Sequence, residues 1–271
     1  FFFFFLGPFP QLGVAGAAYA TVFSRFIGGI FIIFVLFSDK NELTLRLEDF
    51  EFDFEIVKEI YQIGIPAMAN RLLFSVAIIF INLILGAFNS TAIAVMGLIF
   101  RMQSFFLMMV FGLTQGYLPI VGYNYGHNNP QRMKKTILIG NAAALSFGAL
   151  GFIVFQLFPK QIISLFNSDP KLLNIGVDAL RRVSVSYFFM VLNILGVATF
   201  QAVGKGMPSF LITFLRQAIL LVPGMYILGQ IFGLNAVWLS FPIAEFVSFV
   251  IMGSWLIYTI KKSMSRMSNS I

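Results

Sequence analysis

Four charged side chains stand inside long apolar stretches of the second part of this sequence: Arg71, Arg101, Arg216 and Glu245. A charge at the centre of a membrane helix costs about 2.5–3.5 kcal/mol, so it usually faces a polar cavity or an opposite charge. Glu245 is the only acid in the core of these stretches, so we expect it to pair with Arg216, or else with Arg101. The competing interpretation is a pair that only fixes helix packing.

Polar side chains recur around these charges at helical spacing, on three separate apolar stretches. The three faces are Arg101–Ser104–Met108–Gln115, Arg71–Ser75–Ile78–Asn82 and Asn193–Val197–Gln201. Polar faces inside one membrane bundle predict a water-accessible cavity that binds a solute. The predicted cavity residues are Arg101, Ser104, Met108, Gln115, Asn70, Asn82, Asn193 and Gln201.

The residue types also exclude several kinds of chemistry. The sequence has no cysteine and a single histidine, His127, which leaves no Cys–His metal site, disulfide or thiol nucleophile. A membrane-embedded enzyme would need convergent His, Asp or Cys groups near the membrane surface. We therefore expect neither an enzyme nor a bound cofactor or metal ion.

The elements that must position these residues are transmembrane helices. The chain has 271 residues, of which 59% are hydrophobic and 11% charged, whereas soluble domains carry about 25% charged residues. After a helix stub at residues 1–6, seven stretches are long enough to span a bilayer as helices. They are approximately 13–37, 57–86, 91–122, 134–158, 178–203, 208–231 and 234–260. The prediction is an all-α, polytopic membrane bundle, kinked locally by Pro66, Pro119, Pro223 and Pro242.

The 18 Lys and Arg residues predict the orientation of this bundle. If the spans alternate, four lie on one side, four lie inside spans, and ten share the other side. Those ten mark the cytoplasm and are Lys40, Arg46, Lys58, Arg132, Lys134, Lys135, Lys205, Lys261, Lys262 and Arg266. The C-terminus is then cytoplasmic, and the net charge of +7 needs no nucleic acid as a partner.

Acidic residues mark a boundary in the chain, because eight of eleven lie between Asp39 and Glu59. We expect residues 1–37 to end one lobe, 38–56 to form a cytoplasmic linker, 57–260 to form a six-helix lobe, and 261–271 to form a tail. A shift of 220 residues aligns the helix start at 12–17 with that at 232–237, as two homologous halves would. The chain begins with Phe1, so we interpret it as a C-terminal fragment whose first half starts about 180 residues upstream.

Three motifs resemble one transporter family. Residues 112–126 read GLTQGYLPIVGYNYG and resemble the signature at the end of the eighth helix of MATE (multidrug and toxic compound extrusion) transporters. Residues 6–18 resemble the loop between helices 5 and 6 of that family, and 200–206 resemble the end of helix 10. The resemblance, closer to the MepA and DinF bacterial types than to the NorM type, makes the spans helices 6–12 of a twelve-helix, two-lobe protein.

The resemblance implies secondary active efflux of organic cations or other amphipathic small molecules by a monomer in the bacterial inner membrane. Antiport of H⁺ or Na⁺ would drive alternating access of the two lobes. Sodium-coupled NorM types carry acids in helices 7 and 10, whereas here helix 7 has none after Glu59 and helix 10 has Asn193. The coupling residue is therefore expected outside this chain. A lipid-linked oligosaccharide flippase of the same superfamily stays open because of Arg71, Arg101 and Arg216.

Overall fold

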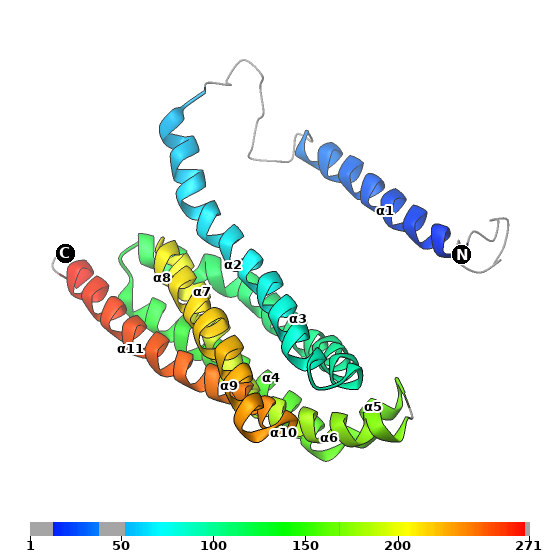
Figure 1. Ribbon diagram of the computed structural model, residues 1–271. Helices are drawn as coiled ribbons and strands as arrows, with labels where there is room; N and C mark the ends of the chain where they lie inside the picture. Colours follow the sequence, from blue (N-terminus) through cyan, green and yellow to red (C-terminus); the bar gives the residue numbers. More distant parts are fainter. Residues whose placement is uncertain (1–12, 38–51, 168, 269–271) are drawn as a thin grey trace. The chain divides into compact units, whose positions relative to one another are not determined.

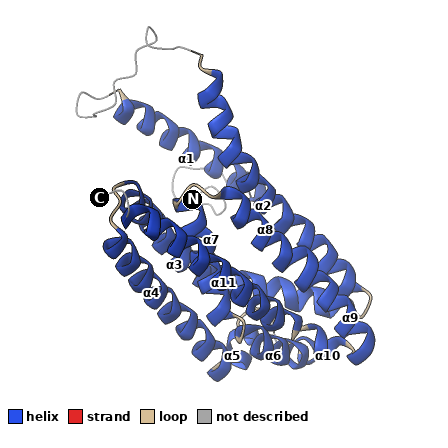
Figure 2. Ribbon diagram, turned by 90° about the vertical axis from the view of Figure 1, so that its left-hand side faces the viewer, coloured by secondary structure: helices blue, strands red, loops and turns tan. Residues whose placement is uncertain are grey.

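The computed structural model describes residues 13–37, 52–167 and 169–268, and within these ranges every regular element is a helix (Figures 1 and 2). The chain divides into two compact units, Phe1–Ile56 and Val57–Ile271, which are described separately. The first unit contributes α1 (Gly13–Leu36). The predicted stub at 1–6, most of the predicted linker and the last three residues lie outside the described ranges.

The second unit holds a bundle of long helices. Its elements are α2 (Phe54–Gly86), α3 (Ser90–Gly126), α4 (Pro130–Leu157), α5 (Pro159–Ser164), α6 (Pro170–Ser184), α7 (Tyr187–Ala202), α8 (Gly206–Phe214), the π-helix η2 (Leu215–Leu221), α9 (Val222–Phe232), α10 (Leu234–Val237) and α11 (Ser240–Ser268). Six helical segments of the described chain could each cross a membrane, and α6 with α7, bent by 49°, forms a possible seventh span. The predicted all-α membrane fold is confirmed.

Polar side chains cap the N-termini of three helices of this unit, α3, α4 and α6. The side chain of Asn89 accepts from the backbone N–H of Ala92 at 2.7 Å, and that of Asn129 accepts from Arg132 at 3.1 Å. Asp169 does the same for Lys171 at 2.8 Å before α6. These caps satisfy backbone donors that the first turn of a helix leaves without partners.

The prolines at which the sequence predicts local kinks all lie within helical segments. Pro66 lies inside α2, and α3 continues through Pro119 to Gly126, a few residues beyond the predicted end of that stretch at about residue 122. Pro223 has a larger consequence. Since its nitrogen cannot donate, the backbone widens just before it into η2, where the N–H of Val222 donates to Gln217 O, five residues earlier.

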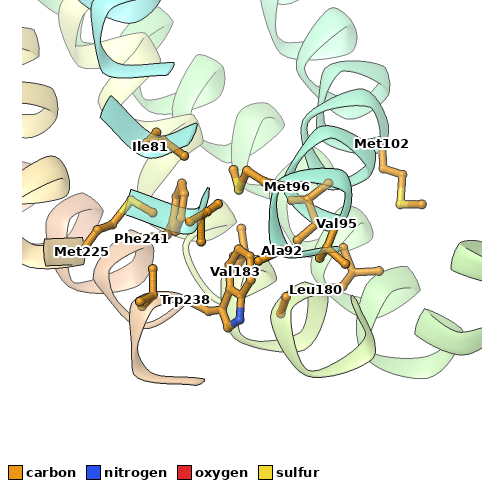
Figure 3. Close-up of a cluster of buried hydrophobic side chains, with 14 of the residues drawn as sticks. Ile81, Ala92, Val95, Met96, Met102, Leu180, Val183, Met225, Trp238 and Phe241 are labelled. Atoms are coloured by element: carbon orange, nitrogen blue, oxygen red, sulfur yellow. The ribbon is translucent and has the colours of Figure 1, made fainter. Parts of the chain in front are cut away.

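An apolar core joins α2, α3, α6, α9 and the turn before α11. Figure 3 shows Trp238 at its centre, with Val183 and Phe241 close by. Trp238 and Val183 are completely buried. A second cluster joins α3, α4 and α7 around Tyr117 and Leu195.

Glycines let the helices of the second cluster approach one another closely. A Cβ on Gly140 of α4 would lie 2.6 Å from the Tyr117 ring, and one on Gly148 would lie 3.1 Å from the backbone oxygen of Tyr187. Tyr117 itself bonds to Thr199 at 2.6 Å across the α3–α7 contact. Thr199 already donates to Leu195 O, so the tyrosine hydroxyl is the donor.

Candidate substrate cavity

The second unit contains a partly open cavity of about 690 Å³. Small-molecule sites in proteins span about 300–1,000 Å³, so this volume suits an amphipathic compound of drug size. Five helical elements form the walls: α2, α3, α7, the α8–η2 segment and α11. Its polar and charged lining residues are Asn70, Arg71, Gln103, Ser104, Thr114, Asn193, Gln201, Thr213, Arg216, Gln217 and Glu245.

Each long helix presents a continuous stripe to this cavity. On α3 the stripe runs through Phe100, Gln103, Ser104, Leu107, Met108, Phe111 and Thr114, and on α2 it runs through Asn70, Arg71, Phe74, Ala77, Ile78 and Ile81. Steps of three and four residues are what a 3.6-residue helical repeat places on one side. Most of the wall is therefore aromatic or aliphatic, with polar groups at a few defined places.

The most polar part of the wall is a three-helix contact at Glu245. Arg216 Nη1 of η2 donates to Glu245 Oε1 of α11 at 2.9 Å. Asn193 Nδ2 of α7 donates to Glu245 Oε2 at 2.7 Å and to the Glu245 backbone oxygen at 3.0 Å. The Arg216 and Glu245 side chains are 19% and 12% exposed, and Asn193 is 2% exposed. Both carboxylate oxygens thus have a donor in a largely desolvated place.

A second polar contact surrounds the buried hydroxyl of Ser209 on α8. Gln201 Nε2 donates to Ser209 Oγ at 3.2 Å, and Asn70 Nδ2 of α2 reaches the same oxygen at 3.5 Å. Gln103 Nε2 of α3 contacts Met190 Sδ at 2.9 Å, where a thioether is a weak acceptor. These bonds link four of the five walls, α2, α3, α7 and α8, through side chains that retain further hydrogen-bonding capacity.

Several buried polar atoms of this wall have no hydrogen-bond partner among the described residues. They are Asn70 Oδ1, Gln103 Oε1, Asn193 Oδ1 and Arg216 Nε, all on side chains that line the cavity. An unpaired buried polar atom costs about 1–3 kcal/mol. Four such atoms on the lining side chains make this wall the part of the described chain where most of the unpaired buried polar atoms lie.

The structure brings together most of the polar residues that the sequence predicts. Asn70, Ser104, Met108, Asn193 and Gln201 line the cavity, and Arg216 lies against Glu245. Both side chains of the Arg216–Glu245 pair line the cavity. This position argues against the alternative that the pair only fixes helix packing.

Three predicted residues, Arg101, Gln115 and Asn82, are not among the lining residues. The α3 stripe is centred on Phe100 and Leu107. Arg101 lies on the helix next to this stripe, so its side chain is exposed but does not line the cavity. Gln115 follows Thr114, the last lining residue of α3, and Asn82 follows Ile81, the last one of α2.

Sequence reasoning missed Gln103, Thr213 and Gln217, which also line the cavity. Gln103 lies one turn before Leu107 on the lining stripe of α3, whereas the predicted face begins at Arg101 and does not include Gln103. Gln217 directly follows Arg216, and the π-helix allows both neighbours to line one wall. In the sequence, Pro223 was the residue that could have indicated an irregular helix at this place, because its nitrogen cannot donate a backbone hydrogen bond.

A polytopic helical bundle with a mixed polar and apolar cavity among its spans is typical of membrane transporters. The family model MatE matches residues 66–227, which is more than half of the chain. The chain belongs to the MATE family.

Curated relatives support the same assignment. The chain is 29% identical over 256 residues to multidrug export protein MepA of Staphylococcus haemolyticus, covering 94% of this chain and 56% of that protein. It is 28% identical over 239 residues to MepA of Staphylococcus aureus strain N315, covering 87% and 52%. The chain therefore spans about half the length of the curated relatives it matches.

Solved structures share the fold. A MATE crystal structure in the straight conformation matches with a TM-score of 0.89 at 25% identity, over 97% of this chain and 59% of that chain. A MOP superfamily transporter from Pyrococcus furiosus, described as having a binding pocket of reversed polarity, matches with the same TM-score, identity and coverage.

Proposed function

We propose that the protein containing this chain exports amphipathic small molecules, organic cations among them, by cation-coupled antiport. The observation that carries the proposal is the cavity of about 690 Å³ among the spans of a MATE-family chain. The multidrug export named for its relatives is consistent with it.

The cavity wall suits substrates of varied shape. Phe74, Phe100 and Phe111 supply flat apolar surface, and Met108 and Met190 supply flexible thioethers. Methionine and aromatic side chains adapt to different ligands without specific hydrogen bonds. The polar residues then act on the charged or hydrogen-bonding part of a substrate.

The transport cycle that we propose uses two six-helix lobes, of which Val57–Ile271 belongs to one. Alternate exposure of the cavity to the two sides of the membrane would carry the substrate outward, coupled to inward movement of H⁺ or Na⁺. We infer that the functional unit is a monomer and that the coupling acid lies outside this chain.

We also propose that the protein crosses the bacterial inner membrane with its C-terminus in the cytoplasm. Asn128, between α3 and α4, would then face the cytoplasm, and Asn167, before α6, would face outward; both are exposed. The chain has no cysteine, so Asn167→Cys should react with an impermeant maleimide on intact cells and Asn128→Cys should not. The reverse labelling pattern would invert the topology.

Transport itself is tested by ethidium accumulation in cells that express the protein from its whole reading frame. We expect lower accumulation than with an empty vector, and loss of this difference when an ionophore collapses the ion gradients, because antiport has no other energy source. Cells that express residues 1–271 alone should accumulate as much dye as the vector control. Equal accumulation in all cells, with the full protein present in the membrane, would reject this substrate class.

A flippase for lipid-linked oligosaccharides is the second candidate function. It is favoured by one observation: Arg71 and Arg216 both line the cavity, where anionic phosphates could meet them.

A further inference from the structure

Helices α4, α5 and α6 form a part of the second unit that lies away from the cavity. None of the described residues that line the cavity belongs to these three helices. Instead, α4 packs on the faces of α3 and α7 that carry Tyr117 and Leu195, neither of which lines the cavity. A second lobe that shares the cavity would therefore lie on the far side of α3 and α7 from α4. Figures 1 and 2 show α5 and α6 at one end of the unit, near α10.

Two contacts fix how the end of α4 and helix α5 run against α6. Gln156 Nε2 donates to the Arg181 backbone oxygen at 2.8 Å. Farther along, a Cβ on Gly176 would lie 2.9 Å from Ile163 Cδ1, so these two residues face each other. The two segments are thus antiparallel, and Lys160 lies between Gln156 and Ile163 in sequence. This register places Lys160 opposite the turn of α6 that ends at Arg181.

The two basic side chains at this place have no acidic partner. Lys160 and Arg181 are exposed, and no carboxylate of the described residues lies within 4.0 Å of either. Asp178, one turn before Arg181, is exposed and makes no ion pair with a described residue. Arg182, by contrast, donates from Nη1 to the Asn235 backbone oxygen at 2.7 Å. Two exposed cations without a counter-charge favour an anionic ligand.

An exposed apolar stripe leads along α4 to these cations. Leu150, Ile153 and Leu157 follow one another at steps of four and three residues, and they are 47–63% exposed. Phe158, which is 50% exposed, continues this α4 stripe to the start of α5. Exposed apolar surface along a membrane helix is where the acyl chains of lipids lie.

The length of α7 places Arg181 at the edge of the hydrocarbon region. With 16 residues, α7 is about 24 Å long, whereas the hydrocarbon core of a bilayer is about 30 Å thick. A turn at 203–204 follows α7, so the last turn of α6, which holds Arg181, completes the span. A basic side chain at this depth extends its charged group into the headgroup layer.

We propose that an anionic phospholipid binds where α4, α5 and α6 meet, with its phosphate at Lys160 and Arg181 and an acyl chain along the α4 stripe. Lysine and arginine side chains both bind phosphate oxygens through charged N–H donors. The site lies outside the cavity, so this inference does not depend on the proposed transport function.

The test measures lipid binding at this place in the full protein. Phe158→Trp puts a fluorophore beside the site, and phosphatidylglycerol or phosphatidylcholine with identical brominated acyl chains quenches it when bound; the protein without this substitution gives the background. We expect phosphatidylglycerol to bind about tenfold more tightly than phosphatidylcholine. Lys160→Gln and Arg181→Gln should each lower this ratio about threefold, the size of effect of one basic side chain at an anionic headgroup.

Three variants in the same reporter protein serve as controls. Arg181→Lys keeps the charge and should keep the ratio, whereas Asp178→Asn removes a repelling carboxylate and should raise it. Lys171→Gln removes an exposed lysine from the opposite end of α6 and should leave the ratio unchanged. A ratio near one in the reporter protein, or one that survives the double change at Lys160 and Arg181, would overturn the inference. An equal fall in Lys171→Gln would do the same.

A further comparison separates a lipid headgroup from a free anion. Leu157→Ser shortens the α4 stripe and should weaken the binding of both lipids about equally, since they share the same acyl chains. Excess inorganic phosphate at matched ionic strength should leave the ratio unchanged, because it lacks an acyl chain. Loss of the ratio in phosphate would reassign the two cations to a free anion and reject the lipid.

Discussion

Helices α3 and α7 each take part in two very different surfaces. Toward α4, Tyr117 of α3 packs on Gly140, and its hydroxyl bonds to the buried Thr199 of α7. Toward the cavity, the same two helices present Gln103 and Asn193, each with an oxygen that lacks a partner. The surface toward α4 is closely packed and hydrogen-bonded, whereas side chains on the cavity surface have oxygen atoms without a hydrogen-bond donor.

We infer from this difference that the packed surface stabilises the second unit and that the cavity surface serves binding. Seven buried side-chain polar atoms of the described residues lack a partner, and four of them belong to cavity-lining residues. Natural proteins retain such atoms chiefly at functional sites, because each one lowers stability. Substitutions on the packed surface and at the unpartnered polar atoms of the cavity surface should therefore have opposite consequences.

The largest effect is expected at the ion pair, which belongs to the cavity but also ties η2 to α11. Glu245→Gln leaves the largely buried Arg216 without its counter-charge and should lower the free energy of unfolding by roughly 2–4 kcal/mol. The measurement is a double-mutant cycle from thermal unfolding of the purified protein with Glu245→Gln, Arg216→Gln and both. The double variant should recover most of the loss. A double variant as unstable as the sum of the single ones would show that the two side chains are not coupled.

The next effect tests the packed surface. Gly140→Ala would place a Cβ within 2.6 Å of the Tyr117 ring, which Thr199 holds in position, so the helices must separate. We expect a loss of about 1–3 kcal/mol, seen as a lower melting temperature.

Gly112→Ala is its control, since a Cβ there meets nothing within 4 Å, although Gly112 opens the family motif. That change should leave the melting temperature unchanged or raise it, because alanine favours a helix by about 1 kcal/mol. Equal losses in the two variants would contradict the steric explanation.

A smaller effect separates hydrogen bonding from packing on the same surface. Tyr117→Phe keeps the ring against Gly140 but removes the donor to Thr199 Oγ1. The expected loss is about 1 kcal/mol, the usual net value of one such bond. Thermal unfolding should place this variant between the parent and Gly140→Ala, and a loss greater than that of Gly140→Ala would count against this ranking.

The smallest effect on stability, with the opposite sign, is expected on the cavity surface. Gln103→Leu removes an unpartnered oxygen and a weak contact to Met190, so the melting temperature should stay the same or rise slightly. Dye export should weaken in this variant if Gln103 contacts substrate. A destabilisation as large as that of Tyr117→Phe would mean that the two surfaces do not differ as we infer.

Much of the architecture could be predicted from the residues alone. The seven apolar stretches correspond to six single spans and the bent α6–α7 pair, because hydrophobic length is set by bilayer thickness and needs no tertiary contact. The partner of Glu245 could also be named, since a lone acid in an apolar environment has few opposite charges within reach. The family motif at 112–126 falls within the region that the family model matches.

The tertiary structure decided which side of each helix matters. Arg101 and Phe100 are neighbours in sequence, yet only Phe100 lines the cavity, because a rotation of one residue moves a side chain by about 100° around a helix. The packing of α3 against α4 and α7 sets the rotation of α3 about its own axis. The spacing of polar residues along α3 alone does not determine this rotation. The widened turn η2, which lets Arg216 and Gln217 share one wall, likewise depends on how the backbone before Pro223 rearranges among its neighbours.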